Sequence, residues 1–166
     1  MGRTLGLSAP PPRTEPIDTA LGLVAVLLLI AATGFFVAVE FALVAVDRDR
    51  VDLDASGGSR RARATAQALR RLSFNLSGAQ LGITVTSLIV GFIAEPTLGR
   101  ALEPLASAVV GDERASGTAI VVALVLATVA TMVVGELVPK SIAIARPRPT
   151  AYALAAPMLV VTRVLG

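Results

Sequence analysis

Long uncharged runs alternate along the chain with short charged segments. The first apolar run extends from Thr19 to Val46 and is interrupted only by Glu40. At about 1.5 Å of rise per residue, a helix of this length reaches roughly 40 Å, which is enough to cross a bilayer. Two further uncharged runs cover Ser73–Ala94 and Thr118–Gly135. Because such runs are hard to bury in a small soluble core, the pattern predicts an all-α membrane protein with three transmembrane helices.

The two ends of the chain differ from this pattern. Residues 1–16 contain four prolines and no periodic apolar face, so we expect a disordered lead-in before the membrane domain of residues 17–166. A cleaved signal peptide is the alternative for the first apolar run, but that run continues well past the small residues that would be cut. A fourth apolar segment starts at Thr150 and contains Arg163. We expect it to form a re-entrant or juxtamembrane helix that is truncated at the C-terminal end.

Positive charge is concentrated in the first segment between apolar runs. Residues 47–72 hold seven arginines against four aspartates, and Arg60–Leu72 has the composition of a basic helix at a membrane surface. The second connection, Thr97–Gly117, has only two arginines and indicates an interfacial segment, with an amphipathic helix over Leu98–Val110 as one alternative within it. Since Lys and Arg in short loops are retained on the cytoplasmic side, this distribution predicts that the N-terminus lies outside.

The residue types that are missing exclude several classes of chemistry. The chain has no cysteine, histidine or tryptophan, so thiolate nucleophiles, His-based zinc sites and His general bases are ruled out. There is no phosphate-binding glycine loop, and the arginines lack the aromatic neighbours typical of a nucleic-acid surface. We therefore expect neither an enzyme nor a bound organic cofactor. Any metal must be held by oxygen, which suits hard cations such as Mg²⁺, Ca²⁺ or Na⁺.

The second apolar run carries a polar stripe. Ser77, Gln80, Thr84 and Ser87 are spaced three, four and three residues apart, which places them on one face of a helix. A polar stripe inside a membrane must face protein or water. The four side chains therefore either hydrogen-bond to neighbouring helices or line an ion pathway, and the sequence leaves both alternatives open.

Two carboxylates lie within otherwise apolar runs. An ionisable group at membrane depth costs at least about 2.5 kcal/mol, so Glu40 and Glu136 are functional candidates. For Glu40, a structural pairing with an arginine is as good an interpretation as ion handling. Glu136 follows Gly135 and precedes Pro139, whose ring removes a helical hydrogen bond and frees backbone carbonyls nearby. A carboxylate beside free carbonyls favours a cation site, with a salt bridge to Lys140 as the alternative.

Three motifs together carry a family resemblance. They are GFFVAVEFAL at residues 34–43, QLGIT at 80–84 and GELVPKS at 135–141. In this order and spacing they resemble the transmembrane domain of the CNNM/CorC family, also called hemolysin-like or cyclin M proteins, over about residues 17–166. The Gly-Glu-x-x-Pro-Lys element is the most specific of the three.

The resemblance implies a dimeric domain of three membrane spans in a transporter of magnesium or related divalent cations, commonly described as sodium-coupled efflux. It also implies cytoplasmic CBS domains that bind adenine nucleotides, and these are absent from the 166 residues. Glu136 and Gly135 match the acidic residue and adjoining carbonyl of the family's third span. Thr84 and Gln80 fall near the polar position of its second span.

The sequence departs from the family pattern in the first span. Val37 and Val39 stand where many members have serines just before the glutamate, and this removes two hydroxyl ligands. We expect a multi-pass protein of the cell membrane that contacts lipid, forms a homodimer and transports magnesium without binding nucleic acid. The alternative is a membrane anchor or regulatory subunit that transports nothing.

Overall fold

Helices make up the structure throughout the part of the chain that it describes. The computed structural model describes residues 16–165, and no strand occurs among them. The all-α prediction is confirmed, whereas the lead-in predicted for residues 1–16 lies outside the described residues except for Pro16, which begins the first helix. The elements in chain order are α1 (Pro16–Ala45), α2 (Arg48–Ser56), α3 (Arg60–Arg70), α4 (Leu72–Val110), α5 (Asp112–Ala130), the π-helix η1 (Thr131–Leu137), α6 (Val138–Ala145) and α7 (Pro147–Leu165).

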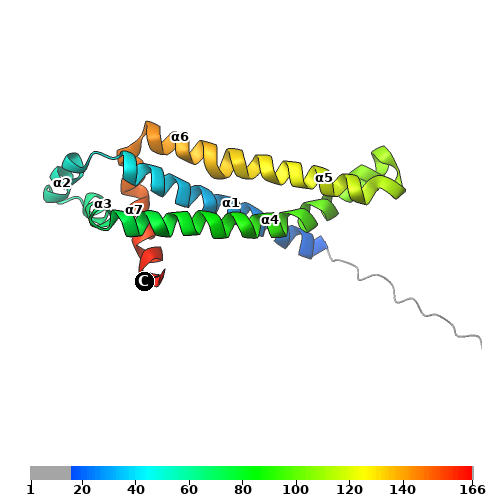
Figure 1. Cartoon of the computed structure of the whole chain (residues 1–166), viewed down its shortest axis with the longest axis horizontal. Helices are drawn as coiled ribbons and strands as arrows, with labels where there is room; N and C mark the ends of the chain where they lie inside the picture. The colour runs from blue at the N-terminus through cyan, green and yellow to red at the C-terminus, as the bar shows by residue number, and fades with distance from the viewer. Residues whose placement is uncertain (1–15, 166) are drawn as a thin grey trace, which may run out of the picture.

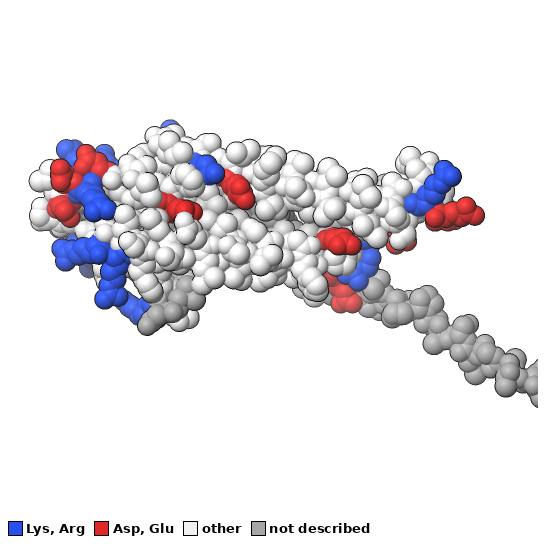
Figure 2. Space-filling view, in the orientation of Figure 1, with Lys and Arg blue, Asp and Glu red and all other residues white. Residues whose placement is uncertain are grey.

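Three long rods form the body of the molecule. α1, α4 and the continuous rod α5–η1–α6 lie side by side in Figure 1, and each is long and apolar enough to cross a membrane. Many large apolar side chains on the outer faces of these rods are exposed. Figure 2 shows an extended middle that is mostly uncharged, with charged side chains gathered toward the ends. The three predicted spans are therefore confirmed, and their exposed apolar faces are suited to lipid.

The rods pack through small residues. α5 turns an alanine ridge inward, with one buried alanine per four residues from Ala115 to Ala127, and sends its valines and leucines outward. On α4, a Cβ added to Gly82 would come within 2.6 Å of the Phe36 ring of α1. Only glycine permits this approach, in agreement with the role of small residues in membrane helix packing.

α4 extends further than its hydropathy predicts. The second span was expected to end at Glu95, followed by an interfacial connection over Thr97–Gly117. Instead one helix continues through Pro96 and Pro104 to Val110, and a turn at Gly111 with φ of +81° leads into α5. Packing along α5 and α1 keeps the helix continuous, although each proline removes one backbone donor.

The fourth apolar segment forms a helix that crosses one end of the bundle. α7 begins at Pro147, three residues before the predicted start, and contacts α1, α3 and α4 (Figure 1). Its buried face consists of Thr162 and of the apolar residues Ala151, Ala155 and Met158, which join a core cluster with Leu43 of α1. We call α2, α3 and α7 the end cap, and Figure 2 shows that charged side chains of both signs gather at this end of the molecule.

Candidate functional site

The third rod changes its helical pitch in its middle. At η1 the backbone N–H of Val138 donates to the carbonyl of Val133, five residues earlier, instead of four. Pro139 follows directly and has no N–H, so no donor from that position reaches the carbonyls one turn before it. Single π-turns inside helices occur frequently at functional sites. The sequence predicts freed carbonyls around residue 135, and the π-turn is the structural form that accompanies them.

The carbonyls of this turn face α1. A Cβ added to Gly34 would lie 3.4 Å from the oxygen of Val134 and 3.7 Å from that of Gly135. It would also lie 3.1 Å from the ring of Pro139, so Gly34 allows η1 and α6 to approach α1 closely. The backbone oxygens of the predicted cation site are thus held at an interface between two spans.

A buried pair of hydroxyls lies next to Gly135. Thr33 of α1 donates to the hydroxyl of Thr86 on α4 over 2.8 Å, and Thr86 donates to the carbonyl of Gly82 over 2.8 Å. The methyl group of Thr33 is one of the near neighbours of Gly135, since a Cβ added to Gly135 would lie 3.6 Å from this methyl group. All three spans therefore meet at this point. Thr86 was not predicted as a site residue, because it lies outside the register of the polar stripe.

Glu40 and Gln80 link two spans directly. The side-chain amide of Gln80 donates to Oε1 of Glu40 over 3.2 Å. Glu40 is half-buried and Gln80 is exposed. Of the two interpretations of Glu40, this contact resembles a structural pairing, with an amide in place of the expected arginine.

The rest of the polar stripe lies on the outer face of α4. Ser77 and Thr84 are exposed, and the hydroxyl of Thr84 donates to its own helix at the carbonyl of Gln80 over 2.9 Å. The face of α4 that packs against the other spans is instead built from Asn75, Ala79, Thr86, Val90, Ala94, Thr97 and Gly99. Within one chain, the stripe therefore does not contact the other helices as a set.

Ser87 differs from the other members of the stripe because it lines a groove with Glu136. This groove has a volume of about 370 Å³ and lies between α4 and the rod α5–η1. We call it the α4–η1 groove. Its polar lining consists of Ser87, Glu95, Thr128, Thr131 and Glu136. Glu95 and Thr131 were not predicted, and only their position across from each other in the folded bundle reveals them.

Two hydroxyls in the α4–η1 groove have no protein partner. The Oγ of Ser87 and the Oγ1 of Thr131 are buried, and neither forms a hydrogen bond with any described residue. Buried hydroxyls are nearly always paired, because desolvation without a partner costs about 1–3 kcal/mol. Two exceptions in one groove, beside a carboxylate, are typical of a place that receives a polar ligand.

Lys140 does not pair with the acidic residue four positions before it. Its ammonium lies 4.7 Å from the ring centre of Phe41, a cation–π geometry, and the ion pair found among residues 16–165 joins Arg148 to Asp54. The carboxylate of Glu136 is therefore not neutralised by Lys140, which leaves its charge available in the groove.

The ligand set is sparse and consists of oxygen. Across the described residues, no group of three or more His, Cys, Asp or Glu side chains is close enough to hold a metal ion. Val37 and Val39 are almost fully buried and contribute no oxygen. A cation in the α4–η1 groove would be held by the carboxylates of Glu136 and Glu95 and by neutral hydroxyls, and it would retain part of its water shell. The carbonyls of Val134 and Gly135 face α1 and do not line this groove.

Three apolar rods with a carboxylate-containing groove between them define a membrane-embedded helical protein. The Cyclin M transmembrane N-terminal domain family, CNNM, matches residues 23–166. The chain belongs to this family.

Similar proteins occur in several bacteria. The UPF0053 protein MT1890 of Mycobacterium tuberculosis is 46% identical over 140 residues, which cover 84% of this chain and 31% of the relative. The uncharacterized protein Rv1841c of the same species is 38% identical over 147 residues, covering 89% and 42%. The UPF0053 protein YhdT of Bacillus subtilis is 38% identical over 143 residues, covering 86% and 31%. The chain thus spans about a third to two-fifths of these relatives.

Proposed function

We propose that this chain is the transmembrane part of a divalent-cation transporter in the cell membrane. Mg²⁺ is the proposed substrate and sodium-coupled efflux the proposed mode of transport, with the N-terminus outside. One observation carries the proposal: Glu136 lies in a π-turn and lines a groove that also holds two unpartnered hydroxyls. Such a set attracts a cation by charge and can exchange its waters for neutral oxygens without binding it irreversibly.

A homodimer is part of the proposal. Ser77, Gln80 and Thr84 are exposed on α4, and polar side chains are poorly solvated by lipid tails. A second copy packed on this face would cover the stripe and enclose the α4–η1 groove. Lipid is the other proposed partner, and adenine nucleotides would act only through domains outside the 166 residues.

The test is magnesium flux in proteoliposomes that contain this chain, a fluorescent indicator and an imposed sodium gradient. Glu136→Gln keeps the size of the side chain and removes its charge, so flux should fall about tenfold or more, the factor that corresponds to about 1.4 kcal/mol of lost cation stabilisation. Glu113→Gln is the matched control, because Glu113 lies exposed in the first turn of the same rod, outside the groove. It should leave flux within about twofold of the unmodified chain, a change below 0.5 kcal/mol.

A folded, dimeric chain without sodium-dependent magnesium flux would contradict the transporter proposal and favour the anchor or regulatory subunit. Equal losses in the two variants would show that general surface charge, and not a site at Glu136, governs the flux. Circular dichroism and size-exclusion profiles on each variant establish that the comparison is made between folded proteins.

A further inference from the structure

The end cap contains a second polar cavity, separate from the α4–η1 groove. It has a volume of about 820 Å³ and lies between α2 and α3. Its polar lining consists of Arg48, Asp52, Ser56, Arg63, Gln67 and Arg70. We call it the arginine cavity. Three guanidinium groups against one carboxylate give it a net charge of +2, which favours an anionic occupant.

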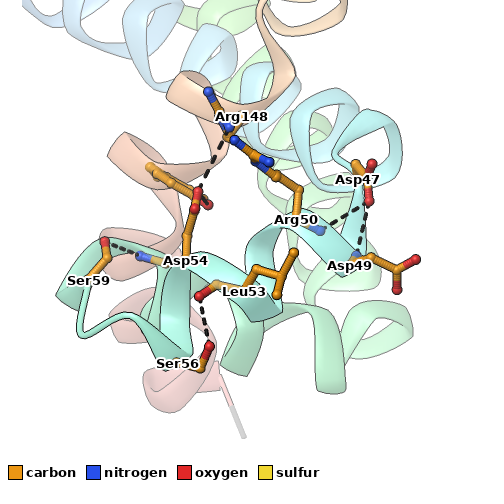
Figure 3. Close-up of polar contacts among 10 residues, drawn as sticks. Asp47, Asp49, Arg50, Leu53, Asp54, Ser56, Ser59 and Arg148 are labelled. Carbon is orange, nitrogen blue, oxygen red and sulfur yellow. Dashed lines mark hydrogen bonds and ion pairs between the residues drawn. The ribbon is translucent and has the colours of Figure 1, made fainter.

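The backbone around this cavity is firmly placed. Asp47 caps α2: its carboxylate accepts from the backbone N–H groups of Asp49 and Arg50, at 3.0 and 3.2 Å (Figure 3). Ser59 caps α3 in the same way over 3.3 Å, after a turn at Gly58 with φ of +95°. Val51 of α2 is fully buried in the core cluster beneath. Caps and core together fix the direction in which both helices present their side chains.

Each helix turns one regular face to the arginine cavity. Arg63, Gln67 and Arg70 are spaced four and three residues apart on α3, and Arg48 and Asp52 are spaced four apart on α2. Arg60 and Arg61 lie on the same basic helix but do not line the cavity. Arg48, Arg63 and Arg70 therefore line the cavity, whereas Arg60 and Arg61 do not.

The guanidinium groups of the cavity have unused donors. The ion pair that the described residues form is Arg148 to Asp54, so none of the three cavity arginines has a carboxylate within salt-bridge distance among them. Arg63 makes one hydrogen bond, to the carbonyl of Gly58 over 3.3 Å. A guanidinium carries five N–H donors in a planar fork that matches a phosphate or carboxylate. Most of that capacity is therefore free.

We propose that the arginine cavity is a binding site for a phosphate group. Several arginines converging from two helices suit a tetrahedral dianion or a phosphodiester, which accepts paired hydrogen bonds on more than one edge. The cavity is lined by α2 and α3, which lie at one end of the three rods (Figure 1). The ends of membrane spans lie at the level of the headgroups, so an anionic phospholipid can supply this phosphate. A soluble phosphate compound would offer the same chemistry, and the experiment separates the two sources.

The structural alternative is that these arginines only form a solvated basic surface that orients the protein. A matched pair of double variants distinguishes the alternatives, because both remove two positive charges from α3. Arg63→Ala with Arg70→Ala removes two of the three guanidinium groups that line the cavity, whereas Arg60→Ala with Arg61→Ala leaves its lining unchanged. General electrostatic attraction predicts equal losses, and a built site predicts a loss in the first variant alone.

The measurement is native mass spectrometry of the purified 166-residue chain in detergent, titrated with phosphatidylglycerol or with phosphatidylcholine. We expect tighter retention of phosphatidylglycerol, weakened about tenfold in the cavity variant and by about twofold or less in the control variant. Arg63→Lys with Arg70→Lys keeps the positive charge but loses the forked geometry of the guanidinium groups. Its retention of phosphatidylglycerol should therefore lie between those of the cavity variant and the control variant. If the Arg63 change unfolds the turn at Gly58, Arg48→Ala with Arg70→Ala provides a variant that leaves this contact in place.

A second arm adds pyrophosphate as the soluble probe. Retention of phosphatidylglycerol that pyrophosphate does not displace identifies a lipid headgroup as the source, whereas displacement dependent on Arg63 and Arg70 identifies a soluble phosphate. Equal weakening by the two double variants would overturn the proposal. So would a folded chain that retains phosphatidylglycerol no better than phosphatidylcholine and does not bind pyrophosphate.

Discussion

The end cap and the middle of the bundle treat their buried polar groups in opposite ways. Where α4 begins against the cap, the amide of Asn75 donates to the carbonyls of Ala68 and Arg71 over 2.9 and 3.1 Å, and its oxygen accepts from the hydroxyl of Thr162 on α7 over 3.2 Å. At the α4–η1 groove, the hydroxyls of Ser87 and Thr131 have no partner in the described chain. The difference teaches that partnering, rather than residue type, separates polar groups that hold the fold from those available to a ligand.

The helices of the end cap are also tied to one another over long sequence separations. Thr65 of α3 donates to the carbonyl of Ala151 on α7 over 3.2 Å, and the phenol of Tyr152 donates to Asp54 of α2 over 2.7 Å. Each contact joins segments more than eighty residues apart. α7 therefore contacts the start of α4 as well as α2 and α3, which gives the cap a defined shape at the end of the spans.

The largest effect is expected at Asn75. Replacing it with leucine removes three hydrogen bonds in a site that is 1% exposed and should lower the free energy of unfolding by about 2 kcal/mol. Unfolding in a titration with dodecyl sulfate, followed by circular dichroism, measures this loss. Ser73→Ala, at an exposed position near the start of the same helix, should change it by less than about 0.5 kcal/mol. Equal effects would contradict the assignment of Asn75 as a structural joint.

A smaller effect is expected at Asp54. Burial raises the pKa of Tyr152 to about 12, and the hydrogen bond to Asp54 and the charge of that carboxylate act in the same direction. Asp54→Asn should therefore lower the pKa of Tyr152, because it removes the carboxylate charge that favours the neutral phenol. The variant should also lose about 1 kcal/mol of stability, as expected for one partly exposed hydrogen bond to a charged group.

The sign of the pH dependence follows from the raised pKa. The folded state favours the neutral phenol, so its contribution to stability is complete below pH 10 and is lost as the pH rises through about 12. Tyr152 is the single tyrosine of a chain without tryptophan, so phenolate absorbance reports it alone. Asp49→Asn, at an exposed carboxylate of α2, is the control. An unchanged titration midpoint in Asp54→Asn would contradict the contact.

Hydropathy predicted the elements, but not the faces that they turn to one another. Uncharged runs locate the three spans because lipid requires them. The stripe from Ser77 to Ser87 identified a common helical face, and yet Thr86, one residue out of its register, is the hydroxyl that packs inside. A span that is apolar on all sides gives no sign of which side meets its neighbours. Contacts such as Thr33 to Thr86 depend on tertiary packing that local spacing does not contain.

The candidate site was predictable in part for a local reason. Proline removes a backbone donor wherever it occurs, so freed carbonyls near Gly135 follow from Pro139 alone. Pro139 alone does not predict the π-turn or the residues of α4 that line the groove. Nor does it predict that Lys140 lies over the ring of Phe41. These features require two helices at a fixed rotation and distance, which only the folded bundle supplies.

The smallest effect on stability is expected at Ser87, and it separates the two regions most sharply. Because the hydroxyl of Ser87 has no protein partner within residues 16–165, Ser87→Ala breaks no hydrogen bond and removes an unpaired buried hydroxyl, so it should not lower the free energy of unfolding. Magnesium flux in the proteoliposome assay should nevertheless fall severalfold, since one neutral oxygen of the proposed pathway is lost. Ser77→Ala, on the exposed part of α4, should leave stability equally unchanged. A stability loss in Ser87→Ala as large as that in Asn75→Leu would mean that the hydroxyl supports the fold, and the contrast between cap and groove would fail.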